Sequence, residues 1–151
     1  MPDDNLLMPT ITETPQPVYR PWRVDSLVYP AFFGGPIAVT YLGTVNARRL
    51  GLSNRKLSLI VATGAAALTA QVLVIVFFLQ DVSNGAQRLS FSAAGIVVWG
   101  VAQYLQRRPF RIFLLRGGEP ASLWGAGVST VIASLLLQFL LIYVVSSAVN
   151  R

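Results

Sequence analysis

The sequence contains no cysteine and no histidine, and charged residues make up only 12% of its 151 residues. Without thiols and imidazoles, the chain cannot form a disulfide, an iron–sulfur cluster, a haem held by two histidines, or a catalytic Ser-His or Cys-His pair. Soluble domains carry about 25% charged residues. The low charge, together with a hydrophobic content of 54%, is typical of an integral membrane protein.

The few charged residues leave four uncharged runs, at residues 26–47, 57–80, 89–106 and 121–150. About 20 apolar residues in helical conformation cross a hydrocarbon core of ~30 Å. We therefore predict an all-α polytopic membrane protein with a proline-rich tail over residues 1–25 and four transmembrane helices over residues 26–47, 57–80, 89–106 and 121–149. The third run is the shortest and contains two serines and two glutamines, but its large apolar side chains favour a crossing over a surface position.

Two other architectures fit these runs poorly. A membrane barrel needs strands that alternate apolar and polar residues, and residues 72–79 do not alternate. A soluble helical bundle needs a polar face that repeats every three or four residues, whereas residues 135–145 contain one strongly polar side chain, Gln138. Helices also pair their own backbone groups, as the interior of a bilayer requires.

Basic residues cluster between the predicted helices. Segments 48–56 and 107–120 each carry four cations, whereas Arg88 is the only one between the second and third runs. Because cytoplasmic loops are rich in Lys and Arg, we expect both segments in the cytoplasm and both termini outside. Arg20 and Arg23 in the tail oppose this orientation.

Segment 107–120 mixes its four arginines with Phe and Leu side chains. This mixture is typical of the membrane interface, where cations contact anionic headgroups and apolar side chains lie just below them. The amount of aliphatic surface favours lipid over nucleic acid as the partner. The predicted headgroup contacts are Arg107, Arg108, Arg111 and Arg116.

The tail contains five of the nine prolines of the chain, which favours extended conformation over a helix. Two alternatives remain for this tail. Either it is disordered, or its last part forms a short ordered strap at the membrane surface. In the second case Tyr19 and Trp22 are the side chains that lie at the headgroups or on a partner.

Residues 32–36 read Phe-Phe-Gly-Gly-Pro, the most distinctive string in the sequence. Pro36 lacks an amide hydrogen and clashes with the carbonyl group four residues earlier, so it predicts a kink in the first helix. Gly34 and Gly35 allow another backbone to approach closely. We interpret the string as a packing kink, with a broken helix of the kind that binds ions or substrates in transporters as the alternative.

The same string opens a longer pattern, Phe-Phe-Gly-Gly-Pro-Ile-Ala at residues 32–38 and Asn-Ala-Arg-Arg-Leu-Gly at residues 46–51. The pattern resembles the first helix of a group of small prokaryotic multi-pass membrane proteins. The resemblance covers this helix and its exit, and the rest of the chain is similar in hydropathy alone. It implies a location in the plasma membrane of a prokaryote and implies no activity.

Small and polar residues within the runs predict contacts between helices. Gly125, Ser129 and Ala133 recur every four residues and form a row on which a second helix can pack, from the same chain or from another chain. Gln71 and Gln138 lie at similar depths in their runs, which predicts a hydrogen bond between them. An intramembrane acid or base, the usual mark of an ion pathway, is missing from the runs.

These features favour a non-catalytic membrane protein that acts through its helices, as an accessory subunit of a membrane complex or as a homo-oligomer. The expected partners are membrane lipids and other membrane subunits or copies of the chain, with structural lipid as the only bound group and no metal or other cofactor. An enzyme is the least favoured class. The alternative is a small transporter or channel, a dimer around the kinked first helix with a polar path through Thr40, Thr44, Asn46 and either Gln71 or Gln103.

Overall fold

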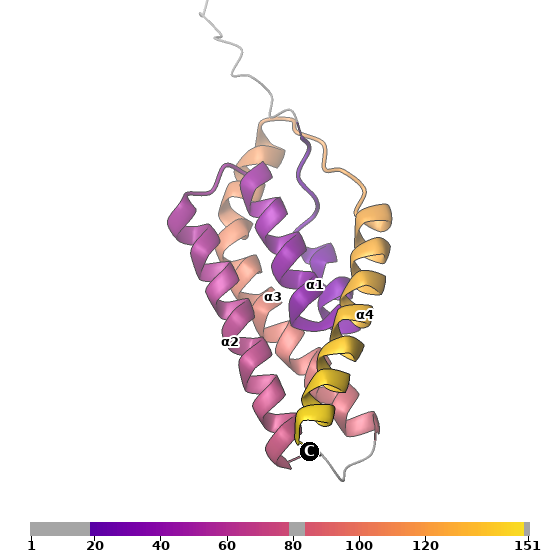
Figure 1. The fold of residues 1–151 in the computed structure, drawn as a ribbon. Coiled ribbons are helices and arrows are strands. Elements are labelled where there is room, and N and C mark those ends of the chain that lie inside the picture. Colours follow the sequence, from indigo (N-terminus) through magenta and orange to yellow (C-terminus); the bar gives the residue numbers. More distant parts are fainter. Residues whose placement is uncertain (1–18, 79–83, 150–151) are drawn as a thin grey trace, which may run out of the picture.

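The computed structural model describes residues 19–78 and 84–149, which form four α-helices (Figure 1). A short 3₁₀ helix, η2 (Asp25–Leu27), leads into α1 (Val28–Arg49), and α2 (Asn54–Phe78), α3 (Asn84–Leu115) and α4 (Trp124–Val149) follow. The segments long and apolar enough to cross a membrane are Asp25–Arg49, Asn54–Val74 and Trp124–Leu141. The all-α prediction with four helices is confirmed, and the three apolar segments indicate a membrane location.

The prediction that the third helix ends at residue 106 and that the arginine-rich segment 107–120 is a loop is wrong, because α3 continues to Leu115. Gly117, with φ 79°, ends the helix. The N–H of Gly118 donates to the Phe113 carbonyl at 3.1 Å and that of Gly117 to the Leu114 carbonyl at 3.0 Å, which is a Schellman motif. The arginines mark where a helix leaves the hydrocarbon, but they do not end the helix. The 32 residues of α3 extend ~48 Å, well beyond a hydrocarbon core of ~30 Å.

The other helix bounds differ from the prediction for related reasons. α2 and α3 begin at Asn54 and Asn84, three and five residues before the predicted starts at 57 and 89, because helices accommodate the basic residues that ended the uncharged runs. α4 begins at Trp124 rather than at residue 121. Ala121 is held outside the helix, since its N–H donates to the Pro21 carbonyl at 2.9 Å.

α1 does not run through the bundle in one piece. Gly35 has φ 65° and ψ −161°, outside the helical region, and separates a first arm (residues 28–34) from a second arm (residues 36–49). The chain before the break lies beside the chain after it. Three pairs of residues share a hydrogen bond or a hydrophobic cluster: Trp22 with Asn46, Leu27 with Leu42, and Ala31 with Val39.

These pairs define a helical hairpin with its tip at Gly35. In a straight helix, residues 27 and 42 would lie ~22 Å apart along the axis and residues 31 and 39 ~12 Å apart. Figure 1 shows the chain descending from the end of the bundle that holds the α1–α2 connection, turning at mid-height and returning to that end. The predicted kink at the Gly-Gly-Pro string is therefore confirmed, but the prediction that residues 26–47 continue in one direction as a single helix is wrong, because the chain reverses at Gly35.

The hairpin also changes where the ends of the chain lie. Residues 19–23, segment 48–56 and the end of α3 all lie at one end of the bundle, which we call the cationic end, and the end of α4 lies at the opposite one (Figure 1). The predicted placement of the N-terminal tail on the side opposite segments 48–56 and 107–120 is wrong for the described residues, because α1 turns back at Gly35. The described end of α4 does lie at the opposite end.

α1 is the centre of the fold. It contacts all three other helices, α2 also packs on α3, and α4 packs mainly on α1. Small hydrophobic clusters connect the layers, such as Ala47, Leu57 and Ile60 between α1 and α2. The break in α1 is therefore surrounded by the helices that could stabilise it.

Candidate functional site

The break in α1 leaves backbone carbonyl groups without helical partners, and side chains from two other helices bind them. Because Pro36 has no N–H, the Phe32 carbonyl lacks its helical donor and instead accepts a hydrogen bond from Ser92 Oγ of α3 at 2.9 Å. Gln138 Nε2 of α4 donates to the Gly34 carbonyl at 2.8 Å. A buried carbonyl without a partner costs about 1–3 kcal/mol, so these two side chains stabilise the break.

Glycines allow the helices to approach the break this closely. A Cβ atom at Gly34 would lie 2.8 Å from Ser134 Oγ of α4, and one at Gly35 would lie 2.9 Å from Gln138 Nε2. A Cβ at Gly95 of α3 would overlap the carbonyl oxygen of Ala31 and lie 3.0 Å from the carbonyl carbon of Gly35. The structure thus places Gly34, Gly35 and Pro36 where α1, α3 and α4 meet.

The predicted hydrogen bond between Gln71 and Gln138 does not form, because Gln138 binds the Gly34 carbonyl instead. Gln71 is 3% exposed, and neither atom of its amide has a hydrogen-bond partner among the described residues. The prediction assumed that similar depth brings the two residues together. α4, however, packs mainly on α1, while α2 packs on α1 and α3.

Gly125, Ser129 and Ala133 lie on the face of α4 that points away from α1. All three are exposed, and a Cβ at Gly125 would meet no described atom within 4 Å. The inward face carries Ser134 and Gln138, which are buried. At ~100° per residue, Ser129 lies ~140° around the helix from Ser134 and ~180° from Gln138. The predicted row therefore takes no part in packing within the described chain.

Trp22 is buried in its own chain. Its backbone N–H donates to Asn46 Oδ1 at 2.7 Å, and the Arg49 guanidinium lies 3.9 Å from the centroid of its ring. Asn46 Nδ2 donates to Gln106 Oε1 at 2.8 Å, and Gln106 Nε2 donates to the Gly43 carbonyl at 2.8 Å. Asn46 and Gln106 are fully buried, so this network fixes the strap and α3 to the second arm of α1.

The prediction of a partner-binding strap is therefore wrong for Trp22, because this side chain is engaged within the chain. Tyr19 is 67% exposed. The strap is also held by an ion pair between Arg20 and Glu119 at 3.2 Å. An ordered strap, one of the two predicted alternatives, is present over residues 19–22, and residues 1–18 of the tail lie outside the described residues.

The four arginines of segment 107–120 are exposed at the cationic end. Within residues 19–78 and 84–149, none of them forms an ion pair with an acid, since the ion pair found there joins Arg20 and Glu119. The predicted contact with lipid headgroups stays a prediction. Three of these side chains project from α3 and one follows it, namely Arg107, Arg108, Arg111 and Arg116.

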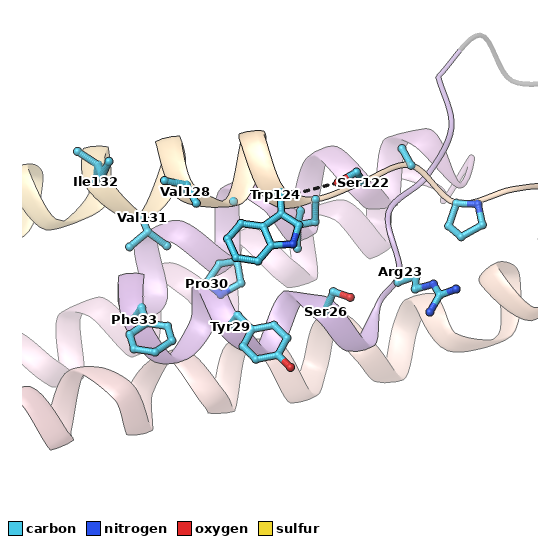
Figure 2. Close-up of a pocket in the computed structure, with 14 residues that line it drawn as sticks. Arg23, Ser26, Tyr29, Pro30, Phe33, Ser122, Trp124, Val128, Val131 and Ile132 are labelled. Atoms are coloured by element: carbon cyan, nitrogen blue, oxygen red, sulfur yellow. Dashed lines mark hydrogen bonds between the residues drawn. The ribbon is translucent and has the colours of Figure 1, made fainter.

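An apolar groove of about 820 Å³ lies between the first arm of α1 and the N-terminal half of α4 (Figure 2). Polar side chains lie at the end nearest the strap, among them Arg23 and Ser122, and the remaining walls are apolar. The sequence gives no sign of this groove, because large apolar side chains in a hydrophobic run look alike whether they pack, face lipid or line a groove. Its main apolar walls are Tyr29, Phe33, Trp124, Val128, Val131 and Ile132.

The acidic side chains of the described residues serve structural contacts. Asp25 accepts a hydrogen bond from Gln103 Nε2 at 2.9 Å, and Glu119 pairs with Arg20. Across residues 19–78 and 84–149, no three acidic side chains gather where they could hold a metal ion.

Sequence reasoning missed Gly95 and the contacts of Ser92 and Gln106. A usable signal was present, because polar residues in an otherwise apolar helix need partners in lipid. Comparisons of the chain with models of protein families, with curated proteins and with solved structures find no match in any of the three.

Proposed function

We propose that the protein is a non-catalytic integral membrane protein that acts as an accessory subunit of a membrane complex or as a homo-oligomer. The observation that carries the proposal is the outward row of Gly125, Ser129 and Ala133 on α4. In lipid, helices associate through close van der Waals packing at small residues. Because α4 uses its opposite face on α1, this row is free to receive a helix of another chain.

The position of α4 supports the proposal. Only 17% of its apolar segment is buried, compared with 50% for that of α1, because α4 packs mainly on one neighbour. Leu136 and Leu140 lie on the same face as the row and are 67% and 60% exposed. They would flank a partner helix seated on the small residues and extend the apolar contact.

The proposed location is the plasma membrane of a prokaryote, in keeping with the resemblance of the first helix, and the cationic end faces the cytoplasm. Ten of the twelve Lys and Arg residues lie at this end, and cytoplasmic segments are rich in both. In this orientation α2, α3 and α4 cross the membrane, and α1 enters and leaves from the cytoplasmic side. Arg20 and Arg23, which oppose a continuous first crossing, agree with this arrangement.

The transporter or channel alternative has less support. Its polar path needs free ligands near the break, but the carbonyls of Phe32 and Gly34 are bound by Ser92 and Gln138. Asn46, another residue of that path, is bound in the network with Trp22 and Gln106. An enzymatic role lacks support because Asp25 and Glu119 are engaged in structural contacts.

The experiment is purification in mild detergents with measurement of the mass of the assembly and of copurified chains. Ser129→Leu should remove the partner or dissociate the oligomer, because it fills the row where a second backbone would lie. Leu137→Phe is the matched control, since Leu137 is 53% exposed on the same helix but outside the row. A chain that is monomeric and free of partners in several detergents would overturn the proposal, as would an unchanged assembly in Ser129→Leu.

A further inference from the structure

The groove between the first arm of α1 and α4 is closed at both ends and open at its side. At the cationic end, the hydrogen bond from Ala121, which lines the groove, to the Pro21 carbonyl joins the segment before α4 to the strap that leads into α1. At the other end Gly34 packs against Ser134. Between Trp124 and Ser134, α4 advances by ~15 Å, about half of a hydrocarbon core of ~30 Å. The groove therefore has the depth of one lipid leaflet.

The walls of the groove change in character along its length. Ser26 and Ser122 lie near the cationic end, Tyr29 and Trp124 follow, and deeper in the groove the walls are hydrocarbon side chains (Figure 2). Tyr and Trp are the side chains that favour the headgroup region of a bilayer. The volume of about 820 Å³ falls within the range of ~300–1,000 Å³ that is typical of ligand sites. This order matches a lipid, with a polar head at one end and an acyl chain below.

Arg23 supplies the charge at the polar end of the groove (Figure 2). Its side chain is exposed and forms no hydrogen bond or ion pair with any residue of the described part of the chain. The nearby charged groups are engaged elsewhere, since Arg20 pairs with Glu119 and Asp25 accepts a hydrogen bond from Gln103. A guanidinium binds a phosphate group through two parallel hydrogen bonds.

We propose that this groove binds an anionic phospholipid, with its phosphate at Arg23 and one acyl chain along the apolar walls. The cationic end favours an anionic headgroup, and the cytoplasmic leaflet is the anionic one. A helix 10–12 Å wide that crossed the bilayer would have to pass the closed ends, so a lipid chain fits better than a partner helix. The choice of leaflet rests on the proposed orientation, whereas the lipid chemistry and the site are independent of the outer row of α4.

The test is native mass spectrometry of the full-length protein in mild detergent with equal amounts of phosphatidylglycerol and phosphatidylcholine. The wild type should retain phosphatidylglycerol at least about fivefold over phosphatidylcholine, and Arg23→Gln should abolish this preference. Arg55→Gln removes an exposed cation from the same end of the bundle outside the groove and should keep the preference. An equal preference for phosphatidylglycerol in Arg23→Gln and the wild type would overturn the proposed phosphate site at Arg23.

A second pair of variants tests the acyl chain. Val128→Trp fills the groove and should lose bound lipid of both kinds, while Leu137→Trp on another face of α4 should keep it; Val128 and Leu137 are 48% and 53% exposed. Ile132→Trp repeats the test if Val128→Trp aggregates. Equal lipid retention in the filled and control variants would refute the proposal. So would a filled variant that dissociates an oligomer with its lipid count unchanged, because the groove would then hold a second copy.

Discussion

Replacing Gly95 with alanine should separate α3 from the break in α1. The added Cβ would overlap the carbonyl oxygen of Ala31 and lie 3.0 Å from the carbonyl carbon of Gly35. Both obstacles are backbone atoms, one in the first arm of α1 and one at the hairpin tip, so no side-chain rotation can relieve the overlap. α3 must move outward, which also lengthens the hydrogen bond of 2.9 Å between Ser92 and the Phe32 carbonyl.

The magnitude follows from three terms. Overpacking costs about 1–3 kcal/mol, and weakening one hydrogen bond costs up to about 1 kcal/mol more. Alanine in place of glycine within a helix returns up to about 1 kcal/mol. We therefore expect Gly95→Ala to lower the free energy of unfolding by about 2 kcal/mol, measured by thermal or denaturant unfolding in detergent micelles.

Gly100→Ala is the matched control for this prediction. The residue lies in the same helix and undergoes the same chemical change, but a Cβ there would meet no described atom within 4 Å. It should leave stability unchanged or raise it by up to about 1 kcal/mol. If Gly95→Ala is as stable as Gly100→Ala, α3 does not approach the break as the structure has it.

Three further predictions concern the break, the glutamines and the orientation. Gly35→Ala should lower the free energy of unfolding by about 1–3 kcal/mol in the same unfolding assay, because φ 65° with ψ −161° is a glycine conformation; stability equal to wild type would argue against the hairpin tip. Gln138→Met should lower the free energy of unfolding by about 1–3 kcal/mol, because it leaves the Gly34 carbonyl unpaired. Gln71→Met should raise the free energy of unfolding by about 1 kcal/mol, because it removes a buried amide without partners among the described residues. A loss of stability in Gln71→Met would show that the amide has a partner. Single cysteines at Tyr19 and Ser53 should react with a thiol reagent from the same side of the membrane and one at Gly85 from the other; Tyr19 on the side of Gly85 would mean that α1 crosses.

The sequence predicts the helices well and their path poorly. Long uncharged runs force helical structure in lipid, so the existence of α2 and α4 follows from hydropathy. The path of α1 does not, because residues 26–47 have the same composition whether they cross or turn back. Gly35 determines the path of α1, because its positive φ reverses the direction of the chain. A Gly-Gly-Pro string predicts a break but not its angle.

The position of a residue along its run also does not predict which helices are neighbours. Gln71 and Gln138 lie at similar positions in their runs, yet a hydrogen bond requires that their helices be neighbours. The sequence also leaves open whether the row of Gly125, Ser129 and Ala133 packs within the chain, and the structure places it outward because the inward face of α4 carries Ser134 and Gln138. Which face of a helix turns inward depends on the carbonyls exposed by α1, and these follow from the break.

The modest hydropathy of α3 is a consequence of the break in α1, because the polar side chains of α3 bind the broken helix. α3 is not among the segments apolar enough to cross a membrane, and its run is interrupted by Ser92, Gln103 and Gln106. Each of these side chains binds the hairpin or its entry: Ser92 the Phe32 carbonyl, Gln103 the Asp25 carboxylate, and Gln106 both Asn46 and the Gly43 carbonyl. Irregular backbone at membrane depth is tolerated only where protein groups satisfy it. A neighbouring helix that carries a few polar side chains is therefore what a chain that turns back at Gly35 requires.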